Sequence, residues 1–424
     1  MYRKNSFAPF IFFLLAATRL AAQTDSLRQP TWLERSEFEV FGVINYYNFD
    51  WQTDSVRRNA IDNERLVIEY SYNRTDRLRF NTEIEFEHGG TGVSVEFDRF
   101  EEFGEFEFDI SKGGEVWVEQ MNLEFSQGEP LGFIVGRFRV PIGLAFEREE
   151  PTDYPTATFS EAEAAILPNN WTETGLALTG RIGNGYRNLR YQLALVNGLD
   201  NSAFNSANWI KRGNQRRFEL INAQSFALCA RTDFYDDKGN LAGISAYFGN
   251  TTGNRPKPDL QTEAPLLLLD FHWMWRYKNL FFNGLALWGS LSDSEAVTNA
   301  NRNLSNNLNV KRTPVGAVAL AGFAEIGADI WKHPSVFQPS EEASLSAYLR
   351  ADYYDTMFKT EGQVFNNPRW ERRSATLGFV YEALYNVQLK MQYTLRKVGA
   401  AAPTSVNGGT LEKTFVVGMA FEFP

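Results

Sequence analysis

Two arginines separated by one residue, Arg137 and Arg139, are the most specific candidates for chemistry in this sequence. Residues two apart in an extended chain point to the same side, so both guanidinium groups would share one face. A guanidinium fork matches the oxygens of phosphate and carboxylate groups, which makes anion binding the chemistry that these residues suit best. The segment that follows is rich in carboxylates, however, and ion pairs with it would make the two arginines structural. The sequence leaves both roles open.

Further basic residues recur on the polar side of alternating segments along the whole chain. Together with the first pair, the candidates for an anion path are Arg137, Arg139, Arg181, Arg190, Arg231, Arg276, Arg350, Lys390 and Arg396. Acidic residues hold equivalent positions at Glu69, Glu83, Glu85, Glu87, Glu124, Asp233, Asp270 and Asp352. Selectivity depends on rings of fixed charge of one sign. Because the signs here are mixed, a single charge is more often a solvated wall residue than a selective one.

Few residues could support catalysis or metal binding. The single cysteine, Cys229, excludes a disulfide within the chain and a cysteine zinc cluster. The three histidines, His88, His272 and His333, are far apart in sequence, and none stands beside a nucleophile motif. We therefore predict no enzyme, no bound metal and no cofactor. The formal net charge of −10 argues against a nucleic-acid-binding protein, which would carry a basic surface.

The N-terminus has the features of a secretory signal peptide. Arg3 and Lys4 precede an apolar run over residues 7–17, and the small residues Ala21 and Ala22 follow. The apolar run is shorter than the roughly 20 residues that a membrane-spanning helix needs. We expect cleavage after Ala22 and export of the mature chain.

The elements that must position the charged residues are extended segments with a period of two. In the final stretch, TFVVGMAFEFP, one side carries Phe415, Val417, Met419, Phe421 and Phe423, and the other side carries small or polar residues. Such alternation is typical of a strand with one apolar face. Sixteen strands are predicted, at residues 37–49, 65–72, 78–87, 116–125, 132–140, 173–180, 188–196, 219–234, 243–249, 264–276, 280–290, 316–330, 344–354, 374–381, 387–396 and 415–423.

The connections between these strands alternate in length. Short links such as 73–77 and 126–131 follow long ones such as 50–64 and 88–115. Bacterial outer-membrane barrels have short periplasmic turns and longer external loops, and an even strand number places both ends in the periplasm. The predicted fold is therefore all-β: a transmembrane, antiparallel, up-and-down β-barrel. The predicted organisation is a signal peptide (1–22), a short periplasmic segment (23–36) and the barrel (37–424).

The longest connection, residues 141–172, is the natural candidate for a loop folded into the barrel to form a constriction. Its charged candidates are Glu147, Arg148, Glu149, Glu150 and Asp153. Aromatic residues gather near predicted strand ends, at Tyr46, Tyr47, Phe49, Trp51, Trp273, Trp275, Trp288, Tyr353, Tyr354 and Tyr381. We expect them to form the girdles found at membrane interfaces, the alternative being a track inside the barrel on which sugars stack.

Several motifs resemble a known family. The runs VEQMNLEF, GRFRVPIGLAFE, PNNWTETGLALTG and YQLALVNG follow one another between residues 116 and 198. They are similar to the phosphate-selective porin O and P family, as are AYLRADYYD and FVVGMAFEF in the C-terminal half. This resemblance implies a sixteen-stranded porin, commonly a homotrimer, with a loop folded into the pore and basic residues lining the anion path. The final Pro424 departs from the aromatic residue on which outer-membrane barrels usually end.

These observations predict a passive diffusion channel in the outer membrane of a Gram-negative cell. Its partners would be outer-membrane lipid and small hydrophilic solutes, with anions such as phosphate among them. The alternative is a non-conducting barrel that binds a partner or adheres through long polar loops such as 291–315. The sequence does not separate these two functions.

Overall fold

The computed structural model describes residues 31–88, 94–98, 107–111, 116–168, 170–185, 187–214, 220–304, 312–399 and 410–424. The predicted signal peptide lies outside the described residues. The chain divides into two units, Met1–Ser36 and Glu37–Pro424. The described part of the first unit contains a short 3-10 helix, η1 (Leu33–Arg35).

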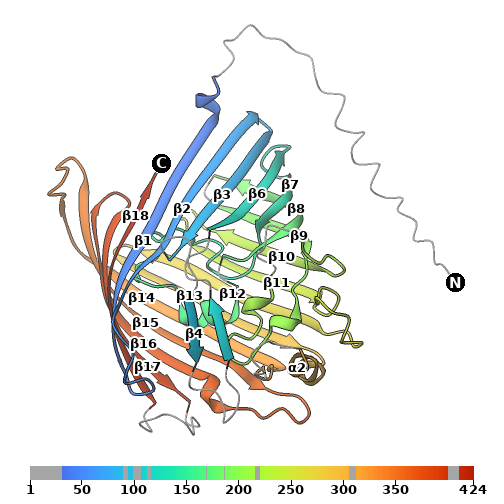
Figure 1. Cartoon of the computed structure of the whole chain (residues 1–424). Coiled ribbons are helices and arrows are strands. Elements are labelled where there is room, and N and C mark those ends of the chain that lie inside the picture. The colour runs from blue at the N-terminus through green and yellow to red at the C-terminus, as the bar shows by residue number, and fades with distance from the viewer. Residues whose placement is uncertain are drawn as a thin grey trace, which may run out of the picture. The chain divides into compact units, whose positions relative to one another are not determined.

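Sixteen strands form one closed antiparallel barrel (Figure 1), so the predicted fold class is confirmed. They are β1 (Ser36–Trp51), β2 (Ala60–Thr75), β3 (Leu78–Glu87), β6 (Val116–Ser126), β7 (Gly132–Arg139), β8 (Thr172–Asn184), β9 (Arg187–Asn197), β10 (Phe226–Tyr235), β11 (Leu241–Asn250), β12 (Pro265–Tyr277), β13 (Leu280–Leu291), β14 (Val318–Pro334), β15 (Glu342–Lys359), β16 (Glu371–Leu384), β17 (Val387–Val398) and β18 (Leu411–Phe423). Each strand pairs with its neighbour in sequence, and β1 pairs with β18 to close the cylinder. Closure leaves no unpaired edge, which is the condition for a sheet in lipid.

The structure adds two details to the predicted strand pattern. The long connection at 88–115 contains a separate hairpin, β4 (Ser94–Asp98) and β5 (Glu107–Ser111), which the sequence did not predict. The second detail concerns the link predicted at 331–343, which is longer than the other short connections. In the structure β14 continues to Pro334 and β15 begins at Glu342. The actual turn is therefore short, and the alternation of short and long connections holds there as well.

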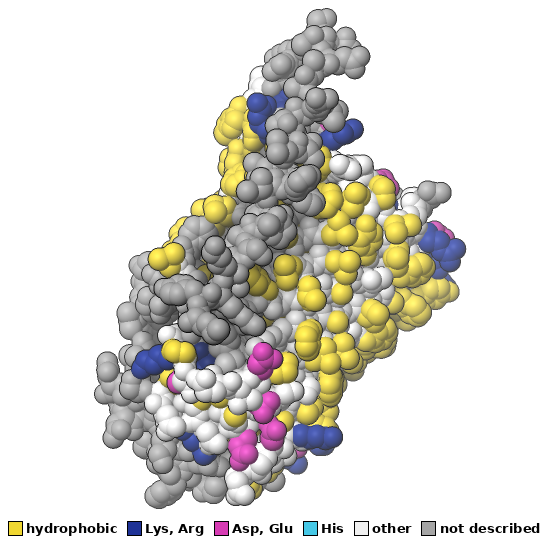
Figure 2. Space-filling model, turned by 90° about the vertical axis from the view of Figure 1, so that its right-hand side faces the viewer, with side chains coloured by type: hydrophobic (Ala, Val, Ile, Leu, Met, Phe, Trp, Pro, Cys, Tyr) yellow, Lys and Arg dark blue, Asp and Glu magenta, His cyan; other side chains and the backbone are white. Residues whose placement is uncertain are grey.

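The two faces of the last strand behave as its sequence predicts. Val417 and Met419 are 42% and 38% exposed, whereas Val416 and Ala420 on the other face are 1% and 0% exposed. The large apolar residues therefore lie on the outer wall and the small ones on the inner wall. Figure 2 shows hydrophobic side chains covering a continuous stretch of the outer wall, with charged side chains toward its margins. This is the surface that a membrane barrel presents to lipid.

Helices are few and short. They are α1 (Glu161–Ile166), α2 (Ser294–Arg302) and the 3-10 helices η2 (Asn201–Ala203), η3 (Lys211–Gly213) and η4 (Pro368–Trp370). Across the described ranges, none of these helices has the length and apolar character needed to cross a membrane. The helix α1 belongs to the long connection between β7 and β8 and lies against β14 and β15 on the opposite side of the barrel.

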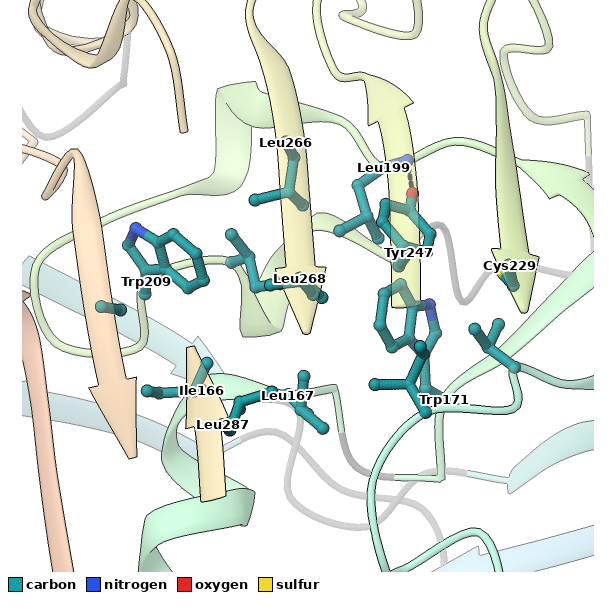
Figure 3. Packing of buried hydrophobic residues seen from close by; sticks show 14 of the residues in the cluster. Ile166, Leu167, Trp171, Leu199, Trp209, Cys229, Tyr247, Leu266, Leu268 and Leu287 are labelled. Atoms are coloured by element: carbon teal, nitrogen blue, oxygen red, sulfur yellow. Dashed lines mark hydrogen bonds between the residues drawn. The ribbon is translucent and has the colours of Figure 1, made fainter. Parts of the chain in front are cut away.

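A hydrophobic core fills part of the barrel interior (Figure 3). Trp171 packs on Tyr247 with ring centroids 4.9 Å apart, and the Tyr247 hydroxyl accepts a hydrogen bond from the Leu199 backbone N–H at 3.3 Å. Trp209 is fully buried, and its indole N–H donates to the Gly316 carbonyl at 2.8 Å. Two connections thus turn inward: residues 140–171, as predicted, and residues 198–214, which sequence reasoning missed.

Candidate functional site

The inward loop at residues 140–171 begins at a glycine clamped to the wall. Gly143 has a φ of +84°, a conformation that residues with a Cβ rarely adopt. Its N–H donates to Asp270 Oδ2 at 3.0 Å, and its carbonyl accepts from Arg231 Nη1 at 2.6 Å. Two wall strands, β10 and β12, therefore fix the point where the loop turns into the interior.

This clamp is part of a buried polar cluster around His272, which is 0% exposed. His272 Nδ1 lies 2.6 Å from Asp270 Oδ1, and Nε2 lies 2.8 Å from Asp233 Oδ1. Arg231 Nε donates to Asp233 Oδ2 at 2.6 Å. Each group has a partner of complementary charge or hydrogen-bonding character, which is the condition under which buried polar groups are tolerated. The cluster is thus a fixed anchor for the loop.

Arg139 occupies the centre of a carboxylate cluster. Its Nη2 donates to Glu83 Oε2 at 2.9 Å and lies 3.3 Å from Glu69 Oε1, while Nη1 pairs with Glu149 of the loop. Arg65 of β2, which pairs with Glu85, also approaches Glu149 at 3.5 Å. The alternative role that the sequence left open for Arg139, pairing with the loop, is the arrangement found here.

Arg137 does not share this surface. The β6–β7 register places it opposite Met121, which is 45% exposed on the outer wall, and its Nε donates to the Glu119 carbonyl at 3.2 Å. The intervening Phe138 is 2% exposed and belongs to the interior core. Arg137 is itself 5% exposed, so it lies buried at the wall although its register partner faces outward, and the two arginines contact different groups.

Three other predicted basic residues hold the loop from the far wall. Lys390 Nζ donates to the carbonyls of Tyr154 and Thr156 at 2.5 and 3.1 Å and also to the Pro151 carbonyl. Arg350 donates to the Thr158 carbonyl at 3.1 Å and pairs with Asp352 at 2.9 Å. The third, Arg396, pairs through Nη1 with Glu161 of α1 at 2.7 Å and through Nε with Glu412 at 2.5 Å.

The predicted loop residues are distributed along this inward segment. Glu147 accepts a hydrogen bond from the Tyr235 hydroxyl at 2.7 Å, and Arg148 lies 3.6 Å from Glu325 of β14. Asp153 lies beside Glu150, to which it is hydrogen-bonded. Asp153 is exposed, but the protein around it still dehydrates its carboxyl in part, and the hydrogen bond and negative charge from Glu150 add to this effect, raising the pKa of Asp153 to about 9.

Among the described residues, at least two cavities remain between the loop and the wall. The outer cavity, of about 140 Å³, lies toward the external ends of the strands, and its charged lining comprises Glu64, Arg65, Glu85, Glu87, His88, Arg139, Glu149 and Glu163. The inner cavity, of about 330 Å³, lies toward the periplasmic turns, and its charged lining comprises Glu124, Glu129, Glu147, Arg181, Arg190, Arg231 and Asp233. Each has room for several water molecules.

The inner cavity contains two predicted arginines that face each other. Arg181 of β8 and Arg190 of β9 are directly opposite in the strand register. Arg181 Nη2 donates to the Gly185 carbonyl and its Nε is buried without a hydrogen-bond partner, while Arg190 lies over the Tyr235 ring at 4.2 Å. Within the described part of the chain, neither guanidinium forms a salt bridge with a carboxylate. The remaining predicted residue, Arg276, is exposed and pairs with Asp329 at 2.9 Å.

His88 brings a further charge to the outer cavity. Its Nδ1 lies 2.8 Å from Asp62 Oδ1, and this hydrogen bond, with the negative charges of Asp62 and Glu87, raises the pKa of His88 to about 9. His88 is therefore protonated at neutral pH. Sequence reasoning treated the histidines only as possible catalysts or ligands, and only the strand pairing brings Asp62 to His88.

Some of the predicted girdle aromatics lie inside the barrel. Tyr47, Phe49 and Trp51 pair with the lumenal residues Val416, Thr414 and Glu412, so the girdle prediction is wrong for these three. Their rings follow one another with centroids 5.7 and 5.3 Å apart. Arg57 lies 4.4 Å from the Phe49 ring centroid and 4.2 Å from that of Trp51, so charged groups already cover these rings.

Three carboxylates, Glu69, Glu149 and Glu150, have oxygens within 4.8 Å of one another. Arg139 bridges two of them, as described above. The arrangement is therefore explained as part of the ion-pair network that holds the loop.

Comparisons with known proteins place the fold among bacterial outer-membrane barrels. No family model matches the chain. An uncharacterized protein of Aquifex aeolicus is 26% identical over 260 residues, covering 61% of this chain and 53% of that protein. The chain thus spans about half the length of this curated relative.

Two solved structures share the architecture at very low sequence identity. OmpF of Salmonella typhi, in complex with daunomycin, has a TM-score of 0.52 and 10% identity, with 92% of this chain and 97% of that chain covered. The outer-membrane channel DcaP of Acinetobacter baumannii has a TM-score of 0.50 and 9% identity, with the same coverage. At these identities the likeness establishes the fold alone: a closed sixteen-strand antiparallel barrel of the outer-membrane porin type.

Proposed function

We propose that the protein is an outer-membrane channel through which small hydrophilic solutes diffuse passively, with a preference for anions such as phosphate. The apolar outer wall suits lipid, and the charged inner wall suits water and solute. The loop at residues 140–171 narrows the passage, and the two cavities mark the space left for solutes.

The observation that carries the anion preference is the pair Arg181 and Arg190. Like charges directly opposite in a sheet repel each other. Neither has a carboxylate partner among the described residues, and both line the inner cavity. Of the four acids in that cavity, Asp233 already pairs with Arg231, and Glu147 is hydrogen-bonded to Tyr235. Glu124 and Glu129 also line it, but neither forms a salt bridge with Arg181 or Arg190 among the described residues. A phosphate or carboxylate bound between the two guanidinium forks would remove the repulsion and fill their free donors.

The experiment is single-channel recording of the refolded mature protein in a planar bilayer, with a KCl gradient and titration with phosphate. Ohmic steps, a reversal potential on the anion side and block by phosphate support the proposal. Steps that show cation preference, or no preference between the ions, would support the channel function and overturn the proposed anion selectivity.

One observation favours a second function. Two inward loops and a hydrophobic core occupy much of the interior, as expected for a non-conducting barrel that binds partners through its external loops. If protein shown to be folded and inserted gives no steps, the channel proposal is wrong and this alternative stands.

A further inference from the structure

We infer that Phe146 is the barrier between the outer and inner cavities, so that its ring sets the resistance of the channel. This inference rests on the proposed channel function and names the residue that limits the flow of ions and solutes through the channel.

The position of Phe146 is the first support. Among the described residues it is the only one that lines both cavities. The outer cavity reaches His88 and Trp171, at the external ends of β3 and β8, and the inner cavity reaches the periplasmic turn at Gly128. A solute that uses both cavities must therefore pass this side chain, which is only half-buried.

The ring is held in place from both sides. Phe146 lies in a tight turn in which the Glu147 N–H donates to the Leu144 carbonyl at 3.0 Å. The guanidinium of Arg231 lies 4.8 Å from the ring centroid, a distance suited to a cation–π contact. The neighbouring Glu147 is fixed by Tyr235. The ring is thus part of the anchored start of the loop, although it lies at the boundary between two hydrated spaces.

The chemistry of the ring makes it a barrier. The cavities on either side are lined by charged groups that can replace water around an ion. A phenyl ring has no polar group that could replace the water around an ion, and the faces of its π-system attract a cation only weakly. Hydrophobic constrictions of this kind gate permeation by excluding water. For a solute that passes from one cavity to the other the two spaces act in series, so the resistance at this residue would dominate that of the whole path.

Phe159 provides a matched control. It belongs to the same loop, is also half-buried and lines the outer cavity, but it does not line the inner one. Its ring packs on Tyr154 at 4.7 Å. Phe159→Ala removes the same atoms from the same loop without touching the boundary.

The test compares single-channel conductance of the wild type, Phe146→Ala, Phe146→Trp and Phe159→Ala. We expect Phe146→Ala to raise the conductance by about twofold or more, Phe146→Trp to lower it, and Phe159→Ala to leave it near the wild-type value. Changes of opposite sign at one position cannot result from misfolding. Equal conductance in all four proteins, or an equal rise in both alanine variants, would overturn the inference.

The same recordings separate this inference from the proposed function. A silent wild type with a conducting Phe146→Ala variant would support the barrier and overturn passive diffusion through the native protein. If both are silent although inserted, both proposals are wrong. In a Cys229→Ala background, Phe146→Cys should also lose current when a bulky charged thiol reagent is added, and an unchanged current would count against the barrier.

Discussion

Arg181 and Arg190 lie directly opposite each other in the β8–β9 ladder, and both line the inner cavity without a carboxylate partner among the described residues. Other predicted arginines at the interior, such as Arg139, Arg350 and Arg396, are paired with acids. Lys390 also has no carboxylate partner among the described residues, but backbone carbonyls of the inward loop take its hydrogen bonds, which leaves Arg181 and Arg190 as the pair that faces a cavity.

Replacing either arginine of this pair with alanine should change the ion selectivity of the channel and have less effect on the folding of the barrel. For Arg181→Ala and Arg190→Ala we expect the reversal potential under a KCl gradient to shift toward cations and phosphate block to weaken, because a bidentate donor is lost in each case. Arg276→Ala is the control, since this arginine is exposed and pairs with Asp329. An equal shift in all three variants would mean that general charge, and not this site, sets the preference.

Lys390 should hold the inward loop against the barrel wall. Lys390→Met keeps a long side chain but leaves three backbone carbonyls of the loop without their donor, at a cost of about 1–3 kcal/mol for each buried group. We expect noisier and larger single-channel currents together with faster tryptic cleavage in the loop. Lys397→Met is the control, because Lys397 lies exposed on the same strand. Currents from Lys390→Met with the same noise and amplitude as those of the wild type would contradict this role of Lys390.

The selectivity should depend on pH through two groups outside the strands. His88 and Asp153 both have a pKa of about 9, so at neutral pH the first is positive and the second is neutral. Raising the pH from about 7 to about 10 removes one positive charge and adds one negative charge, which shifts the preference toward cations. The reversal potential at the two pH values checks this.

The same shifts have consequences for stability with defined signs. The pair of His88 with Asp62 stabilises the fold fully below the usual histidine pKa, and this contribution is lost as the pH rises through about 9. Asp153 binds its proton more tightly in the folded protein, so the folded state loses relative stability as the pH rises from the usual aspartate pKa toward about 9. A variant with His88→Gln and Asp153→Asn should lack both the stability change and the change in reversal potential.

Gly143→Ala should displace the start of the inward loop. Its positive φ costs an alanine about 1–2 kcal/mol, and the new Cβ would overlap the Glu163 carboxylate. Gly239→Ala separates the two effects, since Gly239 has a φ of +80° and no atom lies within 4 Å of the position that a Cβ would take there. We expect Gly143→Ala to lower the thermal unfolding temperature more than Gly239→Ala. Equal losses would show that backbone strain alone is responsible.

The barrel could be predicted from the sequence because lipid imposes one rule on the outer wall. Val417 and Met419 must be apolar whatever the interior contains, so the period of two is visible in β18. The rule fails where the interior is also apolar. Phe138 belongs to the core formed by the inward loops, although polarity predicts that the apolar residue between Arg137 and Arg139 faces lipid.

The interior was less predictable because it depends on contacts between distant segments. The length of the connection at 141–172 indicated an inward loop, but nothing local indicated which wall residues would bind it. The connection containing Trp209 has polar neighbours, and its docking site forms only when β13 and Gly316 come together. The apolar residues Phe204, Trp209 and Ile210 within a polar connection were the available signal.

The contacts of the inward loop also bear on the order of assembly. Its residues bind β17 through Lys390 and Gln392, β18 through Glu422 and β1 through Asn45, the strands on either side of the seam where the barrel closes. Several of these contacts join residues more than 230 positions apart. Loops of this length close slowly because the ordering entropy is lost before the contacts form. The loop would thus serve as a template around which β1 and β18 pair. A barrel that lacks the loop would close this seam more slowly during folding.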